Sequence, residues 1–260
     1  MITLLNGEQW EQNALLEKMY DDDFYYGHLG KHALSSSSIK TILKSPKTYR
    51  NVVKYGKDTA SESPALIAGK IFHWMILEPH KIENLKFVDA STRNTKIYKE
   101  AKAKYGDQYG EVYLTKEKHA SERLADALFR NEAALELLNK AEFEIPAIEM
   151  MEGIAIRGKA DILKNGEIID IKTSADLNTF RYSADKYGYD LQAWLYCQLF
   201  DVEKFTFLVI DKGSCDIAIF ETSEEFLEKG KNKFHQGIDN YKYFFEQDHD
   251  LDQYVMRGVL

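Results

Sequence analysis

The chain has 260 residues, of which 44% are apolar and 29% charged, an ordinary composition for a folded protein with a substantial core. No apolar run reaches the roughly 20 residues of a membrane span, and the N-terminus lacks the basic and apolar regions of a secretory signal. Its two cysteines, Cys197 and Cys215, are too few for a disulfide framework, a four-cysteine zinc site or a four-cysteine iron–sulfur cluster. We therefore expect a cytoplasmic protein with reduced thiols and no membrane partner.

The net charge of −8 conceals a segregation of charge along the sequence. Acidic residues concentrate at positions 21–23 and 246–252, whereas two other stretches are basic. The basic residues are Lys40, Lys44, Lys47, Arg50, Lys54 and Lys57 in the first stretch, and Arg93, Lys96, Lys99, Lys102 and Lys104 in the second. Such clusters are either solvated helix faces or contacts to phosphate, and the pattern leaves both interpretations open.

The first half of the sequence, about residues 1–140, predicts mostly helices. The serines at 35–38 precede an apolar periodic segment and predict a helix start, and a second short helix begins at Ser45-Pro46. Residues 65–77 are apolar on most sides and stop just before a proline, which predicts a buried helix. Residues 115–138 are amphipathic and predict one or two further helices.

From about residue 141 the pattern changes to strands. Strands are predicted at 143–148, 154–163, 167–173, 205–211 and 215–221, with a helix at 191–200. We expect one α/β domain over 1–260, with a mixed sheet of the α+β kind in a core at about 141–222. A C-terminal helix at 224–245 belongs to a last segment, 223–260.

Asn165 and Gly166 stand between two strand-like runs and predict a two-residue type I′ hairpin turn. Paired positions in that register sum to 331, so we expect Asp161 directly opposite Asp170. Side chains alternate across a sheet, which assigns the neighbouring residues to two faces. The face with the aspartates also has Lys159 and Lys172, with Leu163 and Ile168 beside the turn, and the core face has Ala160, Ile162, Ile169 and Ile171.

Two opposed aspartates repel each other and destabilise the strand pair unless something compensates their charge. A divalent cation between the carboxylates is the simplest compensation, and hard oxygen ligands suit Mg²⁺ or Mn²⁺. Lys172 is expected beside them, where an ammonium can stabilise charge that develops on a phosphate. The alternative is a solvated face with Lys–Asp pairs, and a three-residue turn would move Asp161 to the wrong face.

Asp161 followed by Asp170-Ile171-Lys172 resembles the active-site pattern of the PD-(D/E)XK nuclease superfamily. Gln192 and Tyr196, one helical turn apart, resemble the Gln-x-x-x-Tyr motif of RecB-type nucleases. Gly69-Lys70-Ile71-Phe72-His73 resembles the histidine motif of the same group. In combination these motifs are more specific than any one of them alone.

Two segments of the first half resemble N-terminal features of phage and prophage exonuclease VIII (RecE)-type nucleases. They are Leu34-Ser35-x-Ser37-x-Ile39 through Ser45-Pro46-x-x-Tyr49, and Arg93-Asn94-x-Lys96-x-Tyr98. The resemblance spans about residues 34–211 and implies a restriction-endonuclease-like core with a helical N-terminal part. It further implies a 5′-to-3′ exonuclease of double-stranded DNA in a bacterial or phage-infected cell. A ring-shaped homo-oligomer and a single-strand annealing protein as partner are also implied.

The resemblance assigns roles to the motif residues. It implies that Asp161, Asp170 and the main-chain carbonyl of Ile171 bind the metal, that His73 is a further ligand, and that Lys172 is catalytic. A nitrogen ligand favours Mn²⁺ over Mg²⁺ somewhat.

The remaining candidates are contacts to DNA. Gln192 and Tyr196 are predicted to contact the DNA backbone or the catalytic lysine, and packing of their helix onto the sheet is the alternative. DNA-phosphate contacts are predicted for Arg93, Lys96 and Lys40. Glu144 and Glu149 lie on or near the preceding strand, where one of them is a candidate to face the site.

Several alternatives stay open. Residues 153–159 match most of a phosphate-binding P-loop, but Ala160 replaces its Ser/Thr and the segment alternates like a strand, so ATP binding is not expected. An endonuclease with the same site, a non-catalytic DNA-binding or assembly protein, and a hydrolase of small phosphoesters are the competing functions. Cas4-type relatives share these motifs but need four cysteines.

Overall fold

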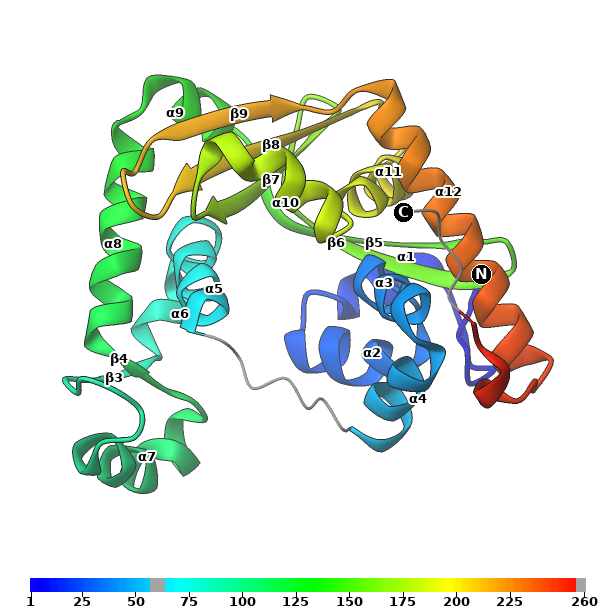
Figure 1. The fold of residues 1–260 in the computed structure, drawn as a ribbon, viewed down its shortest axis with the longest axis horizontal. Helices are drawn as coiled ribbons and strands as arrows, with labels where there is room; N and C mark the ends of the chain where they lie inside the picture. Colours follow the sequence, from blue (N-terminus) through cyan, green and yellow to red (C-terminus); the bar gives the residue numbers. More distant parts are fainter. Residues whose placement is uncertain (57–63, 256–260) are drawn as a thin grey trace.

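The computed structural model describes residues 1–56 and 64–255. Its centre is a five-stranded mixed sheet in the order β5-β6-β7-β8-β9 (Figure 1). The strands are β5 (Glu142–Met151), β6 (Ile154–Lys164), β7 (Glu167–Ser174), β8 (Lys204–Asp211) and β9 (Ile217–Glu221). β7 and β8 are parallel and the other neighbours are antiparallel, which confirms the predicted mixed sheet.

Helices cover both faces of this sheet (Figure 1). On one face, Ile168 and Val209 pack in a core with α3 (Ser36–Lys44), α11 (Tyr189–Phe200) and α12 (Glu224–Tyr241). On the other face, Ile169 and Ile171 pack against a second group of helices. These are α5 (Pro64–Leu77), α8 (Thr115–Arg130) and α9 (Glu132–Leu138). The parallel strands β7 and β8 are therefore buried on both sides, as their continuous apolar sequence requires.

The N-terminal segment packs against the β5–β6 hairpin. Its elements are β1 (Ile2–Thr3), β2 (Gln9–Trp10), α1 (Gln12–Lys18), a π-helix at Asp23–His28 and α2 (Leu29–His32). Leu34 exchanges two main-chain hydrogen bonds with β6, at 2.9 Å to the Ala155 carbonyl and 2.8 Å from the Arg157 amide. This anchor fixes the start of α3 and the following α4 (Pro46–Tyr55) next to the sheet.

A smaller unit lies at one end of the molecule, away from the large sheet (Figure 1). It consists of β3 (Lys86–Val88), β4 (Val112–Leu114) and α7 (Lys96–Tyr109), and α6 (Pro79–Glu83) connects it to α5. β3 and β4 form a short parallel pair that the sequence pattern did not indicate. Two- and three-residue strands carry too little alternation to be recognised.

The predicted helices and strands are otherwise confirmed with shifted ends. The last strand begins at Ile217 instead of 215, because Cys215 has a left-handed φ of 65° in the preceding turn. Helix α10 (Phe180–Lys186) precedes α11, and α12 continues as a π-helix at Lys242–Glu246. Cys197 and Cys215 are free thiols. Lys57 of the first basic stretch lies outside the described residues.

Over the described ranges, no helix has the length and apolar character that crossing a membrane would require.

Candidate active site

The β6–β7 hairpin has the predicted turn and register near its tip. Asn165 and Gly166 have φ values of 50° and 75°, the two positive values that a type I′ turn needs. The pairs Ile162–Ile169, Leu163–Ile168 and Lys164–Glu167 follow the predicted register. The ladder ends there, so the expected direct pairing of Asp161 with Asp170 is wrong.

The strands diverge at Asp161 because β6 is irregular at this residue. Its pairing with β5 skips Asp161 and Glu144, and Glu144 has a left-handed φ of 52°. Ala160 packs with α11 and Ile162 packs with α5, although regular alternation would place them on the same face. The predicted assignment of faces is therefore wrong for Ala160. Ile168 lies on the same side of β7 as Asp170, as predicted, and α11 covers that side.

Lys159 is also turned away from its predicted partner Lys172. Its ammonium lies 2.9 Å from Asp22 of the N-terminal segment, in a buried position on β6. The two strands of the hairpin thus diverge beyond the tip and form a fork, with Asp161 on β6 and Asp170 on β7.

Asp161, His73 and Ile171 meet inside this fork. The Asp161 Oδ2 accepts a hydrogen bond of 2.9 Å from the Ile171 amide and lies 3.3 Å from the His73 Nε2. The same Nε2 lies 2.7 Å from the Ile171 carbonyl oxygen. Helix α5 therefore brings an imidazole nitrogen next to a carboxylate oxygen and a carbonyl oxygen of the sheet.

The imidazole of His73 is charged in this arrangement. Its Nδ1 lies 2.9 Å from the Gly69 carbonyl, so both ring nitrogens face oxygen atoms that only accept hydrogen bonds. Burial lowers the pKa of His73, but the hydrogen bond and charge of Asp161 outweigh it and raise the pKa to about 9. Burial likewise raises the pKa of Asp161, and the His73 charge overcomes this and lowers it.

Asp170 lies on β7, the other strand of the fork, and is almost fully buried. Its Oδ1 accepts a hydrogen bond of 2.6 Å from the Gln192 amide, and its Oδ2 forms an ion pair with the Lys172 ammonium. Burial raises the pKa of Asp170, and the charge of Lys172 offsets this only in part. Among the described residues, Oδ2 contacts only the Lys172 ammonium, so this carboxylate oxygen keeps a lone pair with capacity for another ligand.

These donors fit a divalent cation. An imidazole nitrogen, one or two carboxylates and a carbonyl oxygen form a mixed oxygen and nitrogen set that Mn²⁺ or Mg²⁺ accepts. His73 would bind such a cation through Nε2 after that nitrogen loses its proton, while Nδ1 would keep its hydrogen bond to the Gly69 carbonyl. Side chains alone do not make the set, since the described residues gather no group of three His, Cys, Asp or Glu in coordinating range. The Ile171 carbonyl would supply a main-chain ligand, and Asp170 is turned toward Lys172.

Gln192 and Tyr196 share a helix but have different surroundings. Gln192 reaches Asp170, as described above, whereas Tyr196 is buried in the core between α11 and β6. A Cβ at Gly158 would lie 3.0 Å from the Tyr196 ring and 2.9 Å from Leu199, so this glycine permits close packing of helix on strand. Gly158, part of the apparent P-loop, is thus explained by packing.

Lys40 lies near Lys172 of β7 although it is distant in sequence. Its Nζ is 5.9 Å from the centre of the Tyr189 ring, and the Nζ of Lys172 is 5.1 Å from the same ring. Tyr189 and its neighbour Gly188 were not indicated by the sequence motifs. A glycine just before the motif helix was the available signal, since a turn with positive φ at this position brings the next side chain toward the site.

The chain matches the model of a family described as a PDDEXK-like domain of unknown function (DUF3799), over residues 35–252. The chain belongs to this PDDEXK-like family. The match includes every candidate site residue, and it confirms the nuclease superfamily and the fold that the motifs implied. No curated protein matches the chain in sequence.

A solved structure shows the same fold as this PDDEXK-like domain. A putative exonuclease from Eubacterium rectale is 13% identical with a TM-score of 0.67, over 98% of this chain and 97% of that one. A phage-related exonuclease from Haemophilus somnus is 16% identical with a TM-score of 0.36, over 84% of this chain and 96% of that one. At these identities the first likeness shows the fold alone, and the second has too low a score to support an argument.

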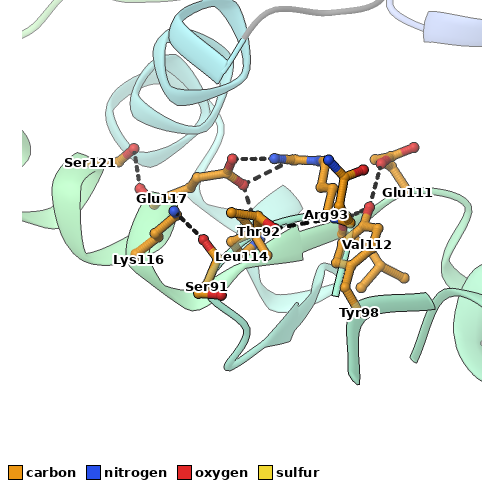
Figure 2. Close-up of polar contacts among 11 residues, drawn as sticks. Ser91, Thr92, Arg93, Tyr98, Glu111, Val112, Leu114, Lys116, Glu117 and Ser121 are labelled. Atoms are coloured by element: carbon orange, nitrogen blue, oxygen red, sulfur yellow. Dashed lines mark hydrogen bonds and ion pairs between the residues drawn. The ribbon is translucent and has the colours of Figure 1, made fainter. Parts of the chain in front are cut away.

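Arg93 and Lys96 of the PDDEXK-like domain lie in the small unit, apart from the aspartates. Figure 2 shows the Arg93 guanidinium directed at the carboxylate of Glu117, with one hydrogen bond at 2.9 Å and a second, shorter one. Glu117 also accepts a hydrogen bond of 2.9 Å from the Leu114 amide. Lys96 is 88% exposed and 3.7 Å from Glu100. Contact of either residue with DNA remains a prediction.

The two candidate glutamates on β5 have different environments. Glu144 is half-buried, and burial together with the charge of Asp161 raises its pKa to about 8. Glu149 is exposed and 2.5 Å from the Gln12 side-chain amide. Of the two, Glu144 is the one beside the fork.

Proposed function

We propose that this PDDEXK-like nuclease is a metal-dependent exonuclease that degrades double-stranded DNA from the 5′ end and leaves 3′ single strands for phage-type recombination. The observation that carries the proposal is the fork, where a histidine, two aspartates, a main-chain carbonyl and a lysine converge. A further support is the likeness in fold to the Eubacterium rectale protein, whose title describes a putative exonuclease.

Each residue of the fork has a definite task in this proposal. His73, Asp161 and the Ile171 carbonyl would hold Mg²⁺ or Mn²⁺, with Asp170 as a further ligand. The bound cation would supply Lewis-acid stabilisation of the phosphate that is cleaved. Gln192 orients Asp170 through its 2.6 Å hydrogen bond, and the half-buried Lys172 ammonium stabilises negative charge that develops on the phosphate.

The lysine is suited to this task because it stays charged. Burial lowers its pKa, but the charges of Asp170 and Asp161 outweigh burial and raise it. A cation in a site with little water acts on a phosphate more strongly than the same cation in bulk solvent.

Linear and closed circular duplex DNA test the proposal directly. With Mg²⁺ or Mn²⁺, linear duplex should be degraded while closed circles survive, and a 5′ label should be released before a 3′ label. Lys172→Ala should abolish the activity, and a cooperative melting transition would show that the variant still folds. Cutting of closed circles would instead identify an endonuclease. Binding of duplex without any cleavage would identify a DNA-binding or assembly protein, and cleavage of small phosphoesters alone would identify the third alternative.

The assembly is a separate part of the proposal and rests on the resemblance to exonuclease VIII-type nucleases. A ring-shaped homo-oligomer that encloses the duplex would give processive degradation, and an annealing protein would take up the 3′ strand. Sedimentation of the purified chain tests the first point, since a monomer at all accessible concentrations contradicts it. Copurification with an annealing protein tests the second.

A further inference from the structure

The side chain of Lys40 is held in one direction by its neighbours. It leaves α3 half-buried and passes over Gly188, whose Cβ, if present, would lie 3.0 Å from the Lys40 Cδ. Gly188 is the N-cap residue of α11 and has a φ of 61°, so it combines a left-handed turn with the space that the lysine stem occupies. Helix α3 contacts α11 and α12, which fixes the helix that carries Lys40.

The ammonium of Lys40 lies near that of Lys172 and has no acidic partner among the described residues. Lys40 and Lys172 place their Nζ atoms at 5.9 Å and 5.1 Å from the same ring, that of Tyr189. In the described part of the chain, Lys40 forms no ion pair or hydrogen bond, whereas Lys172 is paired with Asp170 and nearby Lys233 with Asp190. Burial, and then the charge of Lys172, lower the pKa of Lys40 to about 8.

A half-buried cation next to a second cation is unfavourable unless an anion joins them. The apolar stem and the half-buried Tyr189 ring compensate part of this cost, but a cation over a tyrosine contributes only about 1 kcal/mol. The missing anion is supplied in every substrate of a DNA nuclease, because phosphates repeat along the strand. An ammonium placed near the catalytic lysine is within reach of the phosphate next to the one that is cleaved.

We propose that Lys40, held by Gly188 and Tyr189, is a binding residue for the DNA phosphate that neighbours the scissile phosphodiester. The inference rests on the proposed function, because it takes DNA as the substrate. It adds a subsite that α3 and α11 build on the side of the fork opposite α5. Phosphate recognition at this point would align the strand so that one phosphodiester at a time faces Lys172.

The test is binding of a short labelled duplex, measured by fluorescence anisotropy in EDTA so that cleavage does not interfere. Lys40→Met keeps the stem over Gly188 and removes only the charge. We expect it to raise the Kd roughly tenfold, as for loss of a charged hydrogen bond. The slope of log Kd against log salt should fall by about 1. Lys40→Arg should retain most of the affinity.

The control is Lys44→Met, which removes the same charge from an exposed position one turn further along α3. It should change the Kd by less than about twofold, because exposed charges are screened. Equal effects of Lys40→Met and Lys44→Met would overturn the subsite and leave the proposed function intact. A wild-type chain that neither binds nor cleaves duplex DNA would overturn both. Melting temperatures of all variants, and the arginine variant itself, separate a lost contact from a lost fold.

Discussion

Two clusters of partly buried charge in this chain use similar residues and differ in how completely they are paired. Arg93 donates two hydrogen bonds to the carboxylate of Glu117, which also accepts one from the Leu114 amide at the start of α8 (Figure 2). At the β6–β7 fork, the Asp170 Oδ2 contacts only the Lys172 ammonium in the described part of the chain, and the His73 Nε2 lies between two oxygen atoms.

The difference separates a structural cluster from a candidate site. A fully paired carboxylate has little bonding capacity left for a ligand, and such an ion pair holds its own loop against the next helix. A cluster with unmet bonding capacity and raised or lowered pKa values is poised for a ligand or a reaction. Residue type alone does not distinguish them, since both contain an acid and a base.

The largest effect should follow from Asp170→Asn. Loss of this charge removes the partner of Lys172 and a candidate metal ligand, so the cleavage rate should fall by about 10²–10³-fold or more. Single-turnover cleavage of linear duplex measures it. The matched control is Glu117→Gln in the other cluster, which should lower the melting temperature and keep the rate within about twofold. Comparable losses of rate from both substitutions would break the comparison.

The second largest effect should be on metal binding, which we expect at the fork and not at the Arg93–Glu117 cluster. His73→Ala removes the nitrogen ligand and should weaken Mn²⁺ binding at least about tenfold in calorimetry, with a smaller effect on Mg²⁺. His119→Ala, on the exposed side of α8, serves as the control and should leave both affinities unchanged. Wild-type Mn²⁺ affinity in the His73 variant would remove the histidine from the proposed ligand set.

A stability effect should appear in the small unit. Arg93→Ala leaves Glu117, whose side chain is 7% exposed, without its partner and should cost about 2 kcal/mol of unfolding free energy. Lys96→Ala should stay within about 0.5 kcal/mol. Denaturant melts measure both. If Arg93 instead contacts phosphate, Arg93→Ala will weaken duplex binding and leave the denaturation midpoint unchanged.

The smallest effect concerns pH. Lys40 is charged below its pKa of about 8 and neutral above it, so its attraction for phosphate is present below pH 8 and lost as the pH rises through that value. The charged groups that act on it are Lys172 and Asp170 of β7, Asp190 of α11 and Lys233 of α12. Duplex affinity should therefore fall by severalfold between about pH 7 and 9. Lys40→Arg should remove this dependence, and an unchanged profile in that variant contradicts the assignment.

The sequence by itself determined the local elements and the motif residues. Neighbouring residues decide the type I′ turn, the register at the hairpin tip and the strands β5 to β8. The alternation of apolar and polar residues and the preferences of turn residues therefore predict them. The motif positions 161, 170 and 172 follow from the hairpin and from the resemblance to PD-(D/E)XK nucleases, and position 192 follows from that resemblance.

Only the tertiary structure decided which of these residues meet. The fork at Asp161 arises because β6 must pair with β5 on one side and leave β7 on the other, and no local pattern contains that conflict. His73 contacts the Ile171 carbonyl, 98 positions away in the sequence. Lys40 contacts Tyr189 from another helix, and Arg93 forms its ion pair with Glu117. Such contacts depend on how helices pack on the sheet, which is a property of the whole core and not of any segment.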